Sequence, residues 1–190
     1  MNTFNYNLFN TSLHATTNNL DHFRLLKTVY EKDLFNSENK KLLHKLINLT
    51  EDRSKLIKSQ LYQDIFALLM IGDNHDKTFL EFGATDGLEL SNTYLLEKNC
   101  GWKGVLCEPS PQWHDILKKN RPNTKIITEC IWNISNQKLR FFVSDVGVLS
   151  TLEEFKESDK LSIPGNTKIR IEKGEVVTVN TISLNELIEK

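Results

Sequence analysis

The feature that most constrains the fold is a short apolar segment that runs directly into a glycine-rich turn. The segment is Thr78–Phe82, and the turn is Gly83–Gly87, with the sequence GATDG. A stretch with helical spacing of apolar residues follows from about Ser91 to Asn99. Strand, glycine turn and helix in this order open an α/β unit, so the sequence predicts an α/β fold with parallel central strands.

A second unit of the same kind follows. Trp102–Glu108 is a short apolar run that ends in a carboxylate, and it predicts the second strand. Ser110 and Pro111 predict the start of a helix, which Arg121-Pro122 ends. Because neighbouring parallel strands end side by side, the loops that follow them are expected to form one crevice.

The C-terminal part of the chain carries signals for strands. Residues 125–130 and 139–143 each predict a strand. Polar and apolar residues alternate at 168–172 and 175–180, on either side of Lys173-Gly174, and predict a β-hairpin. A capping box that begins at Ser183 predicts a short last helix.

The N-terminal part is expected to be helical. Residues 1 to about 20 are polar and predict a loose arm, and apolar stripes from about Leu20 to Ile57 predict two helices. A further helix is expected from about Ser59 until Gly72 stops it. We therefore divide the chain into an N-terminal arm with a helical extension, residues 1–58, and an α/β domain, residues 59–190.

Composition excludes several classes of partner. The chain has 24 Lys and Arg against 25 Asp and Glu, a net charge of -1, which gives no reason to expect nucleic acid or an anionic membrane as a partner. No secretion signal or long apolar stretch is recognisable. The three cysteines form no C-x-x-C pair and indicate reduced thiols in the cytoplasm rather than a metal site. We expect a cytoplasmic protein with no metal, no nucleic-acid partner and no membrane partner.

The crevice between the two strand ends suits an adenosine-containing cofactor. Glu108 lies 25 residues after Gly83 (108 − 83), and a carboxylate there can accept hydrogen bonds from both ribose hydroxyls. Gly83 and Gly87 let the backbone approach a ligand closely. The turn reads G-x-x-x-G and not G-x-G-x-x-G, so NAD and FAD are disfavoured and S-adenosylmethionine is favoured. A Rossmann enzyme that handles a nucleotide or sugar stays open as another interpretation.

Polar residues near the turn could bind the amino-acid tail of such a cofactor. Glu81, Asp86, Ser91 and Asn92 are the candidates. Asp86 is explained equally well as a residue that stabilises the turn.

No residue stands out as a general base or as an adenine platform. His75 and His114 are more simply explained as surface or packing histidines. Trp102 and Trp113 could stack on adenine, but their strand and helix positions are more typical of core residues. The catalytic residue is therefore left unassigned.

Four ordered blocks of the sequence resemble the FkbM-type S-adenosylmethionine-dependent methyltransferases. They cover residues 59 to about 123 densely. The first block is Ser59-Gln60 with Gln63-Asp64, and the second is Phe79–Gly87. The third is Ser91-Asn92-Thr93 with Leu96-Glu97, and the fourth runs from Gly101–Gly104 to Glu108-Pro109 and Asn120-Arg121-Pro122. The resemblance implies the Rossmann-like fold of class I methyltransferases and S-adenosylmethionine as the cofactor. It also implies methyl transfer to a hydroxyl oxygen of a sugar or small natural product.

The resemblance places the turn at the methionine end of the cofactor and Glu108 on its ribose. The complete expected cofactor-binding set is Glu81, Gly83, Ala84, Asp86, Gly87, Ser91, Asn92 and Glu108.

The sequence departs from the family pattern at its C-terminus. The family continues with another strand that carries an Asp-x-Glu-Gly element, and the sequence ends at Lys190, before this element. The missing strand would lie beside the first strand, so we expect an incomplete domain with an open sheet edge. The alternative function is therefore a non-catalytic interaction module, completed by a partner or by a second copy through this edge.

Overall fold

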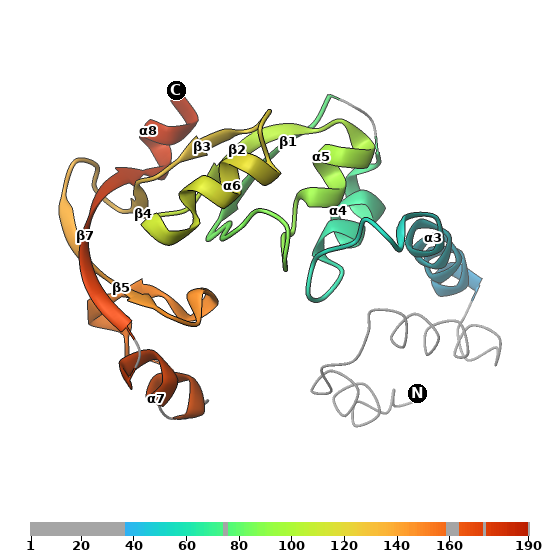
Figure 1. Ribbon diagram of the computed structural model, residues 1–190. Coiled ribbons are helices and arrows are strands. Elements are labelled where there is room, and N and C mark those ends of the chain that lie inside the picture. The colour runs from blue at the N-terminus through green and yellow to red at the C-terminus, as the bar shows by residue number, and fades with distance from the viewer. Residues whose placement is uncertain (1–36, 74–75, 159–163, 173, 190) are drawn as a thin grey trace.

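The computed structural model describes residues 37–73, 76–158, 164–172 and 174–189. The predicted N-terminal arm, the first predicted helix and His75 lie outside the described residues. From α4 (Gln63–Ile71) to β3 (Lys125–Ile127) the chain alternates helices and strands (Figure 1), as expected for an α/β fold. The helices are α3 (Ser37–Arg53), α4 (Gln63–Ile71), α5 (Tyr94–Cys100), α6 (His114–Asn120), α7 (Pro164–Glu172) and α8 (Leu184–Glu189). The strands are β1 (Thr78–Phe82), β2 (Lys103–Cys107), β3 (Lys125–Ile127), β4 (Cys130–Trp132), β5 (Lys138–Ser144), β6 (Thr151–Leu152) and β7 (Gly174–Ser183).

The central sheet is parallel, with strand order β1-β2-β3. Phe82 at the end of β1 pairs with Cys107 at the end of β2, and Cys107 pairs in turn with Ile127 of β3. The carboxyl ends of the three strands therefore meet at one edge of the sheet. This confirms the parallel α/β units predicted from the sequence.

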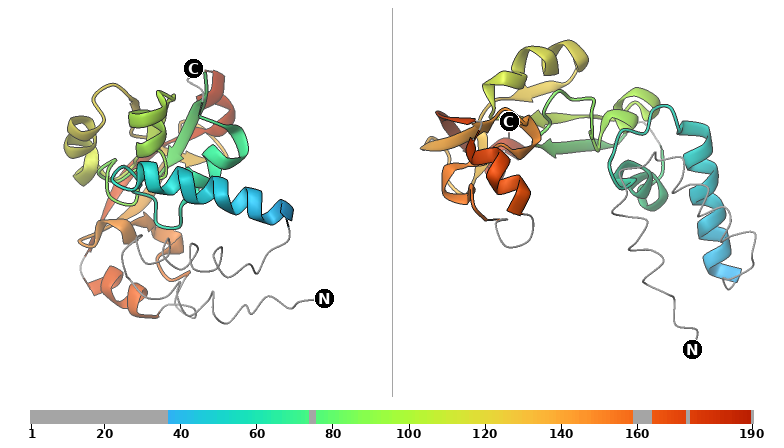
Figure 2. Two further views of the ribbon diagram at one scale, coloured as in Figure 1. Left: turned by 90° about the vertical axis from the view of Figure 1, so that its right-hand side faces the viewer. Right: turned by 60° about the horizontal axis from the view of Figure 1, so that its bottom comes forward.

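A second sheet has the strand order β4-β7-β5-β6. Only Thr128 and Glu129 separate β3 from β4, so the chain passes from one sheet into the other at this point. β4 and β7 are parallel, whereas β5 is antiparallel to both β7 and β6. In Figure 1 and in the right-hand view of Figure 2 this second sheet lies at the opposite end of the described chain from α3.

The predicted C-terminal hairpin is wrong. Its second arm is part of β7, but the first arm lies in helix α7, and β7 pairs with β5 instead. The reason is tertiary: the buried guanidinium of Arg170 donates hydrogen bonds to the carbonyls of Leu149 (2.6 Å) and Lys156 (2.5 Å). A helix lets this side chain reach both carbonyls, and the alternation of residues 168–172 carried no information about them.

Three hydrophobic clusters hold the elements together. The largest contains Leu95 and Leu96 of α5 and Leu117 of α6, which pack on one face of the central sheet around Leu106. On the other face, Leu187 of α8 packs with residues of β1, β2 and β3. The third cluster lies in the second sheet, around Phe141. No helix in the described residues is both long enough and apolar enough to cross a membrane.

Candidate functional site

The glycine turn folds across the carboxyl end of β2. The amides of Gly83 and Ala84 both donate to the carbonyl of Cys107, at 2.9 and 3.2 Å. The next amide, that of Thr85, donates to Glu108 Oε2 at 2.9 Å. The structure therefore brings the predicted turn and the predicted ribose ligand into direct contact.

Glu108 is a buried carboxylate whose oxygens can each accept a further hydrogen bond. It is 4% exposed, and its second oxygen, Oε1, accepts the amide of Ser110 at 2.8 Å. Burial raises the pKa of the Glu108 carboxyl, against the opposing effect of the Ser110 and Thr85 amides and of His114. Because each carboxylate oxygen can accept a further bond, both can still receive hydroxyl donors.

The two glycines of the turn differ in their surroundings. Both have positive φ, +67° at Gly83 and +73° at Gly87. A Cβ atom at Gly83 would meet no heavy atom within 4 Å, so there is room for a ligand beside the strand end. A Cβ atom at Gly87 would lie 2.5 Å from Leu117 Cδ1 and 2.7 Å from Arg121 Cγ. Gly87 is therefore required by the packing of α6, and Gly83 is the glycine that faces open space.

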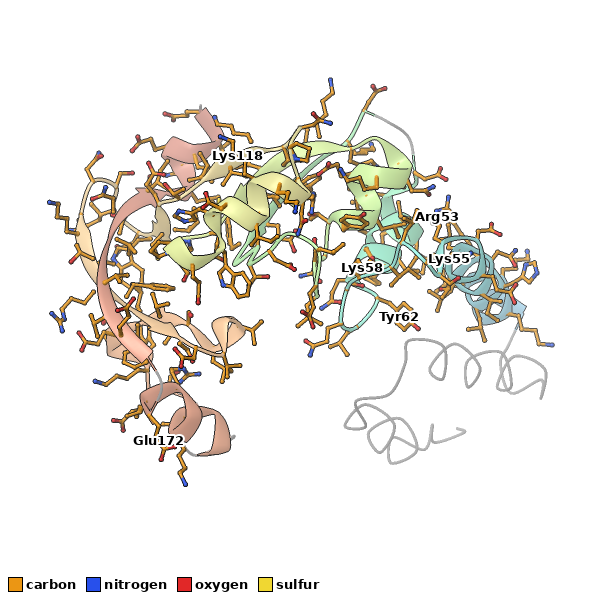
Figure 3. The ribbon with its side chains drawn as sticks, viewed as in Figure 1. Arg53, Lys55, Lys58, Tyr62, Lys118 and Glu172 are labelled. Carbon is orange, nitrogen blue, oxygen red and sulfur yellow. The ribbon has the colours of Figure 1, made fainter. Side chains whose placement is uncertain are left out.

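Three non-glycine residues before, in and after this turn have a left-handed backbone conformation. They are Tyr62 (φ 60°), Thr85 (φ 47°) and Leu90 (φ 60°). Leu90 also bridges to Ser59, and Tyr62 lies on the connection that leads into α4 (Figure 3). Such conformations cost free energy and persist where the surroundings enforce them, as they often do at functional sites.

Glu81 orders the segment that follows the turn. Its carboxylate accepts hydrogen bonds from Ser91 Oγ (3.0 Å), from the amide of Asn92 (2.7 Å) and from Thr93 Oγ1. Ser91 and Glu81 are buried, and the side chain of Asn92 is exposed. The structure thus brings these predicted residues together, and their contact with a cofactor stays a prediction.

Asp86 has a structural role in the turn. Its Oδ1 accepts the amides of Leu88 (2.9 Å) and Glu89 (2.8 Å), the pattern of an Asx turn. Its carbonyl accepts Asn120 Nδ2 at 2.8 Å.

A hollow of about 250 Å³ is formed by the segments that follow β2 and β3 and by three residues of β7. It is lined by Pro109, Pro111, His114, Thr128, Glu129, Thr178, Val179 and Asn180. The lining is mostly polar side chains with two prolines, and residue spacing gave no indication that β7 would contribute to it.

The two tryptophans considered for adenine stacking pack within the protein. Trp102 is 4% exposed and belongs to the largest hydrophobic cluster. The indole of Trp113 packs against Gly147, where a Cβ atom would lie 2.0 Å from the ring. The core interpretation is therefore confirmed for Trp102, and Trp113 contacts the segment after β5.

The described histidine near the site also has a backbone partner. His114 Nε2 lies 2.8 Å from the carbonyl oxygen of Glu108. In the part of the chain that the structure describes, no group of three or more His, Cys, Asp or Glu side chains could hold a metal ion. The general base remains unassigned.

Two buried charged residues were not predicted from the sequence. Arg121 is fully buried and contacts the turn, although the sequence showed only that it ends a helix. Asp64 is also fully buried and accepts a hydrogen bond from Ser59 Oγ at 2.5 Å. The signal that could have found them is their place in the motif blocks, since both belong to them.

A comparison with protein families gives one match. The model described as the methyltransferase FkbM domain matches residues 81–190, which is more than half of the chain and includes all eight predicted site residues. No curated protein and no solved structure matches the chain.

Proposed function

Because the chain belongs to the FkbM methyltransferase domain family, we propose that it uses S-adenosylmethionine to methylate a hydroxyl oxygen of a sugar or small natural product. The observation that carries this proposal is the Glu108 carboxylate, held by the Thr85 amide at the point where β1 and β2 end. This is the place where α/β sheets of this kind bind adenosine-containing cofactors.

The residues present fit such a cofactor. Glu108 would accept the ribose hydroxyls, because both its oxygens retain acceptor capacity. The open space at Gly83 leaves room beside the strand end, and the hollow lined by Pro109 and His114 offers a place for the adenine ring. When bound, the cofactor supplies an electrophilic methyl group on a sulfonium sulfur.

The protein's share of the reaction is to position the acceptor and to take its proton. Methyl transfer forms a carbon–oxygen bond to the acceptor and breaks a carbon–sulfur bond, while the hydroxyl proton passes to a base. We assign no described side chain to that base. His114 lines the hollow, but its Nε2 already contacts the Glu108 carbonyl.

Glu108→Gln tests the ribose contact by isothermal titration with S-adenosylhomocysteine. The substitution keeps the size of the side chain and removes charge-assisted hydrogen bonds, each worth about 1.5 to 3 kcal/mol, so the affinity is expected to fall roughly 10- to 100-fold. Glu153→Gln is the matched control, because Glu153 lies just after β6 and pairs with Arg140 of β5. Unchanged affinity of a folded Glu108→Gln variant contradicts the ribose role.

A second candidate function, an interaction module, is favoured by the edge of β1. Among the described strands, β1 has only β2 as a neighbour, and Phe82 at its end is 52% exposed. A second copy could pair along this edge, because an unpaired strand edge is a template for another chain. Sedimentation at increasing concentration tests this: Phe82→Asp is expected to abolish a dimer, and a monomer at all concentrations contradicts it.

A further inference from the structure

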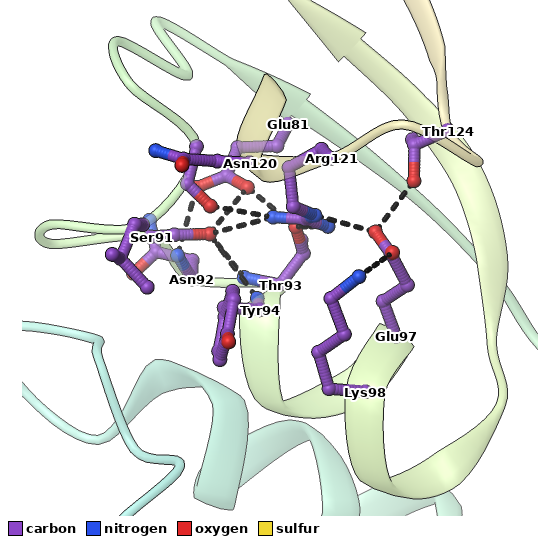
Figure 4. A network of polar contacts seen from close by, with 12 residues as sticks. Glu81, Ser91, Asn92, Thr93, Tyr94, Glu97, Lys98, Asn120, Arg121 and Thr124 are labelled. Carbon is purple, nitrogen blue, oxygen red and sulfur yellow. Dashed lines mark hydrogen bonds and ion pairs between the residues drawn. The ribbon is translucent and has the colours of Figure 1, made fainter. Parts of the chain in front are cut away.

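Arg121 is a fully buried guanidinium that makes polar contacts with four different residues (Figure 4). Nε donates to Glu97 Oε2 at 2.5 Å. Nη1 donates to the carbonyl of Gly87 at 3.0 Å and to Ser91 Oγ at 3.2 Å, and Nη2 donates to Thr93 Oγ1 at 3.1 Å. One side chain at the end of α6 therefore holds the segment between β1 and α5 at three points.

The two hydroxyls connect Arg121 to Glu81. Arginine only donates, so Ser91 Oγ and Thr93 Oγ1 accept from it and keep their own protons for the Glu81 carboxylate. The direction of every hydrogen bond in this part of the network is thereby fixed. The buried charges of Arg121 and Glu81 lie on opposite sides of the same two hydroxyls.

Glu97 supplies the direct counter-charge of Arg121. Burial acts to raise the pKa of Glu97, but hydrogen bonds from Lys98, Thr124 and Arg121 outweigh it and hold this pKa below its ordinary value. The guanidinium also lies 5.6 Å from the ring centroid of Phe79 and 5.8 Å from that of Tyr94. Cation–π contacts of this kind favour the planar guanidinium of arginine in a desolvated place.

Three hydrogen bonds, joined through the backbone of the turn, connect the Arg121 side chain to the Glu108 side chain. Arg121 holds the carbonyl of Gly87, and the Gly87 amide donates to the carbonyl of Ala84 at 2.7 Å. The next residue is Thr85, whose amide donates to Glu108 and whose φ of 47° is unfavourable for a β-branched residue. The strained conformation of Thr85 therefore depends on contacts that residues outside the turn, such as Arg121, make with it.

We propose that Arg121 is a positioning residue for the cofactor site: it fixes the turn so that the Thr85 amide and the Glu108 carboxylate are aligned before the cofactor binds. The inference rests on the proposed function for its cofactor. The alignment itself belongs to this chain and can be measured without a ligand. Lysine cannot replace arginine here, because its three donors radiate from one nitrogen and cannot match acceptors spread around a planar group.

The test compares Arg121→Lys with Arg170→Lys. Arg170 is the matched control, since it is also buried and holds two backbone carbonyls, but it does so between α7 and the segment that follows β5. Arg121→Lys is expected to weaken S-adenosylhomocysteine binding about tenfold or more and to shift the Thr85 amide signal in ¹⁵N NMR spectra of the ligand-free protein. Arg170→Lys is expected to lower the melting temperature and to leave both readouts unchanged.

A double-mutant cycle separates positioning from loss of stability. If Arg121 acts through Glu108, Arg121→Lys costs less than about threefold in affinity when Glu108→Gln is already present. Thr93→Val is the milder second variant, in case Arg121→Lys does not fold, and it is expected to shift the Thr85 amide in the same direction.

The two proposals fail in different ways. A wild-type protein that does not bind S-adenosylhomocysteine refutes the cofactor, while the Thr85 amide of the ligand-free variants still decides the role of Arg121. An unchanged Thr85 amide in Arg121→Lys and Thr93→Val, or an undiminished effect of Arg121→Lys in the Glu108→Gln background, overturns the positioning role.

Discussion

Gly83 and Gly87 lie in one turn and have similar positive φ values, but the structure needs them for different reasons. The backbone conformation favours glycine at both positions. At Gly87 the limit is also steric, because Leu117 and Arg121 lie within 3 Å of the place of a Cβ atom. At Gly83 that place is open, so a side chain there would compete only with a ligand.

We therefore expect the two alanine variants to fail differently. Gly87→Ala is expected to lower the free energy of unfolding by about 1 to 3 kcal/mol, because it overpacks a buried contact. This loss comes in addition to the cost of placing alanine at a positive φ. Gly83→Ala is expected to cost less stability and to weaken S-adenosylhomocysteine binding more. Urea unfolding and isothermal titration of both variants measure this, and the reverse order of either effect contradicts the assignment.

At the scale of the element, the start of α4 is built around a buried acid. Asp64 Oδ1 accepts Ser59 Oγ at 2.5 Å and the amide of Ile65 at 2.8 Å, whereas Oδ2 has no hydrogen-bond partner. Burial raises the pKa of Asp64, and burial together with the Asp64 charge raises the pKa of Tyr62 to about 12. The ionised carboxylate is thus held at a cost in stability.

Asp64→Asn is expected to stabilise the protein in a pH-dependent way. The pKa of Asp64 is higher in the folded state than in the unfolded chain. The stability that Asp64 contributes is therefore fully present below its unfolded-state pKa, and it is lost as the pH rises through its folded-state pKa. The variant is therefore expected to gain about 1 to 3 kcal/mol at pH 8, a gain that shrinks toward pH 4. Urea unfolding from pH 4 to 8 measures it, with Asp115→Asn, at an exposed position on α6, as the control.

A gain that does not change with pH would contradict the raised pKa of Asp64. A loss of stability at pH 8 would show that the Asp64 carboxylate is satisfied in the folded state.

The elements that the sequence predicted well are those with local signals. β1 and the turn after it, β2 ending before Glu108, and the stop of α6 at Arg121 all follow from composition, glycine and proline. The region of α7 was predicted wrongly, because its conformation depends on carbonyls that Arg170 reaches 14 and 21 residues away.

The candidate site also combines features with a local sequence signal and features that depend on distant residues. The proximity of the turn to Glu108 follows from parallel strands and could be predicted. The network around Arg121 could not, because its bonds to Thr93, Ser91 and Gly87 join residues 28, 30 and 34 positions apart, and no spacing rule connects them.

At the scale of the whole molecule, each hydrophobic cluster contains one free cysteine. Cys100 lies in the largest cluster, Cys130 in the cluster of the second sheet, and Cys107 in the cluster under α8. All three are less than 10% exposed. Burial raises the pKa of each thiol, that of Cys107 to about 12, so almost no reactive thiolate is present at pH 8.

The thiols can therefore report whether the three clusters open together. In the native protein at pH 8 we expect the three described cysteines to react with a thiol reagent only through unfolding, and at one common rate if the domain unfolds cooperatively. Single Cys→Ser variants assign the three rates. Fast reaction of one thiol would identify a cluster that opens on its own.

If the proposed function is right, the turn at residues 83–87 and Glu108 form the cofactor site. The most direct measurement is a titration of the ¹⁵N-labelled protein with S-adenosylhomocysteine, followed by NMR. Saturable shifts are expected, concentrated in the amides of residues 83–87, Glu108, Ser110 and 112–114. No shifts with a demonstrably folded protein, or shifts concentrated elsewhere, would contradict it.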